Sequence, residues 1–203
     1  MLGNFLRKLR RNLNRLNDYL FMIETHAFGN FVPENAKYLI LGSFTARQAF
    51  KENRSYNKSY DWFYSNKRNQ FWFILEKVYE QQLENKQEKQ KLFSNLCIAI
   101  ADIILQCERK ENNNLDKNLI NSVYNIDAIT KILDQNKIKK IFFTSCFVEK
   151  KFKQIFKDVL NSYKEIEMIA LPSPSPRFAR MNKQQKIRKY KELLPNLNLD
   201  QQI

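Results

Sequence analysis

The sequence predicts an α/β fold, a three-layer α/β/α sandwich around a central, mainly parallel sheet of four strands. Short apolar runs of strand length alternate along the chain with longer segments of helical periodicity. Strands that alternate with helices form parallel sheets whose two faces are both covered. The hydrophobic share is 43% of 203 residues, which is enough for one well-filled domain and scarcely enough for two.

Each predicted strand is a short apolar run that ends at a glycine or in a polar segment. The predicted strands are residues 37–43, 96–101, 139–145 and 165–171. The predicted helices are residues 71–79, 126–136, 149–163 and 181–194. Two polar segments between these elements predict loops, residues 53–69 and residues 107–121. Long loops in compact domains are often functional.

The first 22 residues differ from the rest of the chain. Leucines recur there at spacings of three and four, and arginines and lysines fill the other faces. This pattern predicts a basic amphipathic helix over residues 1–22, in front of an α/β domain over residues 23–203. Packing on the domain, self-association through the leucines, further nucleic-acid contact, membrane-surface docking and organellar targeting are all compatible with such a helix.

The charge balance indicates a polyanionic partner. Lys and Arg number 35 against 21 Asp and Glu, so the formal net charge is +14. Nucleic acid is the first candidate and an anionic membrane surface the second, and a basic surface kept for solubility is the alternative to both. No apolar run is long enough to span a bilayer. Three widely spaced cysteines build neither a disulfide framework nor a four-cysteine metal site, so we expect a reducing compartment, cytoplasmic or nucleoid-associated. We also expect neither a metal nor a cofactor.

The segment after the last predicted strand, LPSPSPRFAR, is suited to phosphate. Prolines fix the backbone, so Ser173 and Ser175 are held with little entropic loss. Cations follow at once and continue into the basic helix. Rigid hydroxyls that lead into a cation-rich helix fit a nucleic-acid backbone better than an ordinary solvated helix does. The predicted DNA-binding residues are Ser173, Ser175, Arg177, Phe178, Arg180 and Lys183.

Four motifs in order resemble one known family. They are LILGSF (39–44), KRNQFW (67–72), IADIILQCER (100–109) and LPSPSP (171–176). Over residues 24–193 the chain resembles the uracil-DNA glycosylase superfamily, and most closely its hypoxanthine (deoxyinosine)-DNA glycosylase branch, related to the mismatch-specific uracil glycosylases. The resemblance implies the uracil-DNA glycosylase-like fold. It also implies a monofunctional enzyme that flips a deaminated base out of DNA and hydrolyses its N-glycosidic bond.

The resemblance also assigns roles to single residues. Asn69 matches the asparagine on which that branch relies, and its amide can hold a water or read a base edge. The alternative for Asn69 is an N-cap in front of the helix over residues 71–79, while Phe71 and Trp72 are expected in the core. The base pocket that the resemblance implies consists of Gly42, Ser43, Phe44, Tyr64 and Asp102.

Some positions depart from the pattern of the branch. Thr45 stands where the branch usually has proline, Asn66 and Lys67 stand where it has His-Pro, and Pro174 and Ser175 stand where it has Thr-Ser. These departures leave open which base is excised. They also keep a second interpretation open, a catalytically altered or inactive nucleic-acid-binding protein that retains the fold. The single histidine, His26, is expected to be structural.

Overall fold

The computed structural model describes residues 23–45, 62–66, 68–110 and 116–197 of the chain. The predicted helix over residues 1–22 and most of the predicted loop over residues 53–69 lie outside these residues. Within them, no helix is long and apolar enough to cross a membrane.

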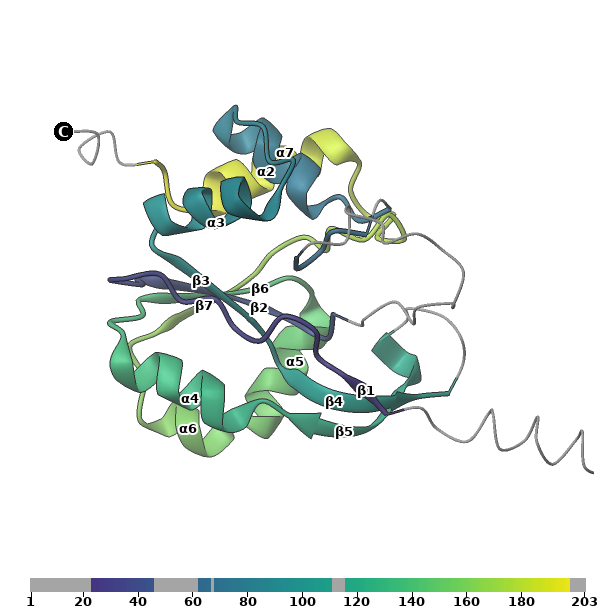
Figure 1. Ribbon diagram of the computed structural model, residues 1–203, viewed down its shortest axis with the longest axis vertical. Helices are drawn as coiled ribbons and strands as arrows, with labels where there is room; N and C mark the ends of the chain where they lie inside the picture. Colours follow the sequence, from purple (N-terminus) through teal and green to yellow (C-terminus); the bar gives the residue numbers. More distant parts are fainter. Residues whose placement is uncertain (1–22, 46–61, 67, 111–115, 198–203) are drawn as a thin grey trace, which may run out of the picture.

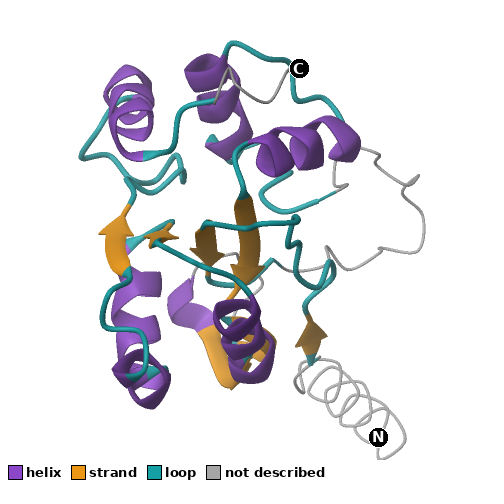
Figure 2. Ribbon diagram, turned by 90° about the vertical axis from the view of Figure 1, so that its left-hand side faces the viewer, coloured by secondary structure: helices purple, strands orange, loops and turns teal. Residues whose placement is uncertain are grey.

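A four-stranded, all-parallel sheet forms the centre of the fold. Its strands lie in the order β3-β2-β6-β7. They are β2 (Tyr38–Gly42), β3 (Ile98–Asp102), β6 (Lys140–Phe143) and β7 (Glu167–Ala170). Helices lie on both sides of these strands in two views (Figures 1 and 2). The predicted three-layer sandwich and all four predicted strands are therefore confirmed.

A second, antiparallel sheet was not predicted. Its strands are β1 (Glu24–Thr25), β4 (Ile104–Arg109) and β5 (Leu119–Tyr124), in the order β1-β4-β5. A short 3₁₀ helix, Asp116–Asn118, precedes β5. The predicted loop over residues 107–121 is therefore wrong over most of its length. Both long strands mix apolar and polar residues, and only Ile104 and Cys107 of β4 are buried, so the sequence signal for a strand is weak there.

Three helices, α2 (Phe71–Tyr79), α3 (Lys86–Asn95) and α7 (Lys183–Leu193), cover one face of the parallel sheet (Figure 1). Helix α2 has the predicted bounds, and α7 lies within its predicted range. Helix α3 was not predicted, since the sequence KQEKQKLFSN buries only Lys89, Leu92 and Phe93. Asn85 begins α3 with a capping box, in which its side chain and that of Glu88 each accept a backbone N–H.

The other face is covered by α4 (Ile126–Gln135), α5 (Cys146–Ile155) and α6 (Lys157–Asn161). The prediction of one helix over residues 149–163 is wrong. Ser145 is the N-cap of α5, so this helix begins three residues earlier than expected. The helix ends before Phe156, whose φ of −98° and ψ of 21° are not helical. The side chain of Phe156 is fully buried and stacks on Phe152, with ring centroids 4.5 Å apart. Core packing therefore fixes this break between α5 and α6.

The core has two parts, one on each face of the parallel sheet. Alternation along β2 sends Leu39 and Leu41 to one part and Ile40 to the other. Phe71 and Trp72 are buried in the second part, as predicted, and the ring of Trp62 stacks on Trp72 with centroids 5.6 Å apart. Burying a side chain of this size contributes about 1.5–3 kcal/mol.

Candidate functional site

The candidate site lies at the carboxyl edge of the parallel sheet. Strands β2 and β3 end there on a register pair, Gly42 and Asp102, and Thr144 follows the end of β6. In open parallel sheets this edge is where ligands bind.

Asp102 is the buried polar centre of this edge, with 1% of its surface exposed. One of its carboxylate oxygens, Oδ2, accepts from the hydroxyl of Thr45 at 2.7 Å and pairs with Nε2 of His26 at 2.9 Å. The backbone N–H of Phe28 donates to Nδ1 of His26 at 3.4 Å, which assigns the ring proton to Nε2. His26 therefore donates to Asp102 and fixes the orientation of its carboxylate.

The other oxygen of that carboxylate, Oδ1, is buried and has no hydrogen-bond partner among the residues that the structure describes. It lies beside Gly42, where an added Cβ would overlap both this oxygen and the hydroxyl of Tyr64. Gly42, Tyr64 and Asp102 are thus brought together as expected. Only glycine fits at position 42 while these two oxygens keep their places.

Tyr64 reaches this point from a strained backbone, since its φ is +56°, in the left-handed region that non-glycine residues rarely adopt. Its hydroxyl lies 3.0 Å from Oγ1 of Thr144, and its ring contacts Phe71 with centroids 4.5 Å apart. Burial raises the pKa of Tyr64 well above its ordinary value, and the charge of Asp102 raises it further. Tyr64 therefore stays protonated.

Ser43 and Phe44 contact other partners. The hydroxyl of Ser43 donates to Oδ1 of Asp116 at 2.8 Å. Burial raises the pKa of Asp116, while this hydrogen bond lowers it. The ring of Phe44 lies edge-on to His26, with centroids 6.0 Å apart. Ser43 therefore bonds a second carboxylate, and Phe44 contacts a hydrogen-bond partner of Asp102. Neither residue makes a described hydrogen bond to Asp102 itself.

Asn69 lies immediately before helix α2. Gln70 is the N-cap of that helix and makes no side-chain cap bond, so the N-cap alternative for Asn69 is displaced by one residue. Oδ1 of Asn69 nevertheless accepts the backbone N–H of Phe71 at 2.9 Å. Its Nδ2 has no hydrogen-bond partner in the described part of the chain. No described hydrogen bond or ring contact joins Asn69 to Asp102.

The loop after β7 is held at its backbone oxygens. The hydroxyl of Tyr190 donates to the carbonyl of Pro172 at 2.9 Å, and the N–H of Gln70 donates to that of Pro174 at 2.9 Å. Helix α7 and the N-cap of α2 therefore both hydrogen-bond to the backbone of this loop. The hydroxyls of Ser173 and Ser175 accept the N–H groups two residues further on, each at 3.3 Å. Each hydroxyl keeps its own proton to donate to a phosphate.

A buried lysine completes this anchor. Nζ of Lys186 donates to the carbonyl of Ser175 at 2.9 Å and to Oε1 of Gln70 at 3.0 Å. It also lies 5.5 Å from the ring centroid of Phe178, within the range of a cation–π contact. The predicted residues Arg177, Arg180 and Lys183 are exposed beside it. These three side chains are thus exposed at the surface, and Nζ of Lys183 lies 5.0 Å from the ring centroid of Phe73.

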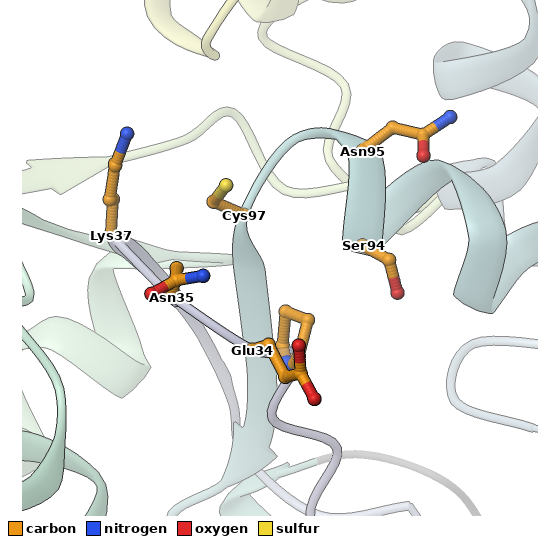
Figure 3. A pocket seen from close by; sticks show the side chains of 7 residues that line it. Glu34, Asn35, Lys37, Ser94, Asn95 and Cys97 are labelled. Carbon is orange, nitrogen blue, oxygen red and sulfur yellow. The ribbon is translucent and has the colours of Figure 1, made fainter. Parts of the chain in front are cut away.

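A shallow cavity lies at the opposite edge of the sheet. It has a volume of about 580 Å³ and lies between the amino ends of β2 and β3 and the end of α3 (Figure 3). Its lining includes Glu34, Lys37 and Cys97 but no predicted site residue. In the described ranges, no three His, Cys, Asp or Glu residues are grouped so that they could hold a metal ion.

Sequence reasoning missed several members of the site. Thr45 was singled out only as a departure, and His26 was expected to be structural. Lys186 was counted among the cations of the basic helix but is buried, and Asp116 and Thr144 had no assigned role. Thr144 could have been found from its position near the carboxyl end of the strand predicted over residues 139–145. His26 and Asp116 contact Asp102 and Ser43 across 76 and 73 residues, which no local pattern reveals. Comparison with known proteins finds no family model that matches the chain and no curated protein that matches it.

Proposed function

We propose that this protein is a monofunctional DNA glycosylase, which flips a deaminated base, hypoxanthine or uracil, out of DNA and hydrolyses its N-glycosidic bond. The observation that carries the proposal is the convergence of Gly42, Tyr64 and Asp102 at the carboxyl edge of the parallel sheet. The rigid serine-proline loop and its exposed cations follow β7 at this same edge. A base site beside a phosphate-binding surface is what a base-flipping enzyme requires.

The chemistry needs fixed dipoles more than mobile groups. Cleavage leaves positive charge on the sugar and negative charge on the departing base, so preorganised polar groups lower the barrier. Asp102 and Tyr64 are both held by partners and do not need to reorganise. The free amide nitrogen of Asn69 is the group we assign to the attacking water or to the base edge.

The DNA backbone would meet the loop after β7 and the start of α7. Ser173 and Ser175 offer hydroxyl protons from a loop whose carbonyls are already bonded. Exposed cations beside them would neutralise phosphates, which gives affinity without sequence preference. The groups assigned to phosphate are Ser173, Ser175, Arg177, Arg180 and Lys183.

A cleavage panel tests the proposal. Oligonucleotides with a single hypoxanthine, uracil or xanthine are incubated with the protein and treated with alkali, which breaks the strand at abasic sites. We expect breaks with the wild type and at least a hundredfold slower excision with Asn69→Asp. This variant keeps the oxygen that accepts the N–H of Phe71, replaces the amide nitrogen with a second oxygen and adds one negative charge. A hundredfold loss corresponds to roughly 2.7 kcal/mol of transition-state stabilisation.

A second candidate is a nucleic-acid-binding protein with altered or lost catalysis. The observation in its favour is that the carbonyl oxygen of Asn69 already bonds the start of α2, which is a structural use. It predicts salt-dependent DNA binding that Asn69→Asp leaves unchanged, and no abasic product from any base in the panel. Blank lanes for the wild type beside clear DNA binding would favour this candidate.

A further inference from the structure

The carboxylate of Asp102 has two oxygens with unlike surroundings. Oδ2 is saturated, because the hydroxyl of Thr45 and Nε2 of His26 both donate to it. Oδ1 is as deeply buried and has no donor within the described part of the chain. Buried polar atoms almost always have a hydrogen-bond partner, so an exception at a candidate site asks for a ligand or water that supplies the donor.

A Cβ added at Gly42 would overlap both this oxygen and the hydroxyl oxygen of Tyr64, so the two oxygens lie close to the same point beside Gly42. Thr144 donates its single hydroxyl proton to the carbonyl of Leu41, at 3.3 Å. The hydroxyl of Tyr64 therefore donates to Thr144, at 3.0 Å, and presents a lone pair elsewhere. Two acceptors thus lie beside the bare Cα of Gly42, and Oδ1 receives no donor from the described residues.

We propose that Oδ1 of Asp102 is the specificity-determining acceptor that reads a ring N–H of the flipped base, an inference that rests on the proposed glycosylase function. Deamination of adenine to hypoxanthine turns ring N1 from an acceptor into an N–H donor. Deamination of cytosine to uracil does the same at N3. A carboxylate oxygen only accepts, so it pairs with the ring N–H of either product and with the ring nitrogen of neither parent base, adenine or cytosine.

The strand position and hydrogen-bond partners of Asp102 suit a specificity-determining acceptor. The residue ends a fully buried strand, and its backbone oxygen accepts from Nδ2 of Asn125 at 3.2 Å. His26 and Thr45 hold its carboxylate from one side, so Oδ1 cannot turn away without breaking those bonds. A site built to bond a substrate N–H can reject an analogue that lacks it by roughly 10⁴-fold or more, because the buried acceptor is then left unpaired.

The test compares two bases that differ at the position in question. Purine, in oligonucleotides containing deoxynebularine, lacks the N1 proton and O6 of hypoxanthine, and its N1 is an acceptor. Single-turnover excision rates of hypoxanthine and purine give a preference ratio for each protein. We expect Asp102→Asn to reduce the wild-type ratio at least tenfold, since its amide N–H can donate to N1 of purine. Asp127→Asn removes the same charge from the exposed first turn of α4 and should keep the wild-type ratio.

An unchanged ratio in an active Asp102→Asn protein would overturn the inference and leave the proposed function intact. If the wild type excises no base, the proposed function fails, and binding of free hypoxanthine and free purine, followed by NMR, still tests the acceptor. The same binding measurement on the wild type serves if Asp102→Asn does not fold. Preference for hypoxanthine supports the role of Oδ1, and equal binding of the two bases contradicts it.

Discussion

Lys186 donates from its Nζ to the backbone oxygen of Ser175 at 2.9 Å, although only 1% of the lysine is exposed. The same ammonium donates to Oε1 of Gln70 at 3.0 Å, so one buried charge joins α7, the loop after β7 and the start of α2. Burial lowers the pKa of Lys186. Because Gln70 adjoins Asn69, the loop assigned to DNA and the amide assigned to catalysis are held as one piece.

Lys186→Met should destabilise the protein. Methionine fills a similar volume but leaves the carbonyl of Ser175 and the amide oxygen of Gln70 without their donor, at a cost of about 1–3 kcal/mol. Urea unfolding measures the loss. Lys189→Met, an exposed position on the same helix, removes only a surface ion pair to Glu192 and should change stability by less than about 1 kcal/mol. Equal losses of unfolding free energy in the two variants would mean that the hydrogen bonds of the Lys186 ammonium do not stabilise the fold.

Gly42→Ala should destabilise the carboxyl edge by about 1–3 kcal/mol, as overpacking of a well-filled site does. The new methyl group would overlap Oδ1 of Asp102 and the hydroxyl of Tyr64. Tyr64→Phe removes one of these two atoms, so the double variant should recover part of the loss. A double-mutant cycle of unfolding free energies measures this coupling. Strict additivity of the two substitutions would contradict the close approach at Gly42.

Gly29→Ala serves as the comparison for that cycle. Gly29 has φ +64° with no atom within 4 Å of an added Cβ. Alanine at this position would therefore meet no steric overlap, and its cost would come only from the left-handed backbone conformation. We expect a cost of about 1–2 kcal/mol. Since Tyr64 is not involved at Gly29, Tyr64→Phe should not reduce this cost.

Asp116→Asn should change how stability depends on pH. Burial raises the pKa of Asp116 above its ordinary 3.8, so the folded protein binds this proton more tightly than the unfolded chain does. The stabilisation from its protonated form is complete below pH 3.8 and is lost as the pH rises through the raised value. Asparagine still accepts from Ser43, so the variant should gain stability at pH 7 and little at pH 3.

Unfolding in urea over the range from pH 3 to pH 7 checks this prediction. Asp127→Asn, which removes an exposed carboxylate, is the matched control and should follow the wild-type profile. Parallel profiles for wild type and Asp116→Asn would show that Asp116 does not titrate differently in the folded and unfolded states.

Removing the exposed cations after β7 should weaken DNA binding and its dependence on salt. For duplex DNA, the slope of log affinity against log salt concentration becomes shallower by about 0.9 for each phosphate that the protein no longer neutralises. Fluorescence anisotropy between low and physiological salt gives that slope. The test variant replaces Arg177, Arg180 and Lys183 with alanine. The control variant makes the same charge change with exposed lysines of α4 and the segment before β6, at Lys131, Lys137 and Lys139. An equal reduction of the slope in both variants would place the DNA elsewhere.

The sequence was informative where burial is strong and local. Helix α2 follows the predicted bounds because its apolar residues Phe71, Trp72, Ile74 and Leu75 all face the core. Helix α3 was missed because it is a polar element that packs through few residues. Strands β4 and β5 were missed because they bury few of their residues, so tertiary contacts rather than local pattern define them.

The candidate site was predictable in its components and not in its partners. Asp102, Gly42 and Tyr64 were expected together, and the structure brings them together. The donors that orient Asp102 come from the segment after β1 and from Thr45, and a hydrogen bond across 76 residues leaves no periodic trace. The carbonyl that Lys186 bonds is likewise invisible in a sequence, which shows side chains and not the direction of backbone groups.

A single residue, Ile103, separates strand β3 of the parallel sheet from strand β4 of the antiparallel sheet. Its N–H donates to the carbonyl of Gly42 at 2.9 Å, and its own carbonyl accepts from Asn125 at 2.9 Å. One added residue here would turn every side chain of β4 to the opposite face and pull Cys107 out of the core. This junction therefore constrains the length of the chain and, because the side chain of Ile103 is fully buried in the core, the type of residue that connects the two sheets.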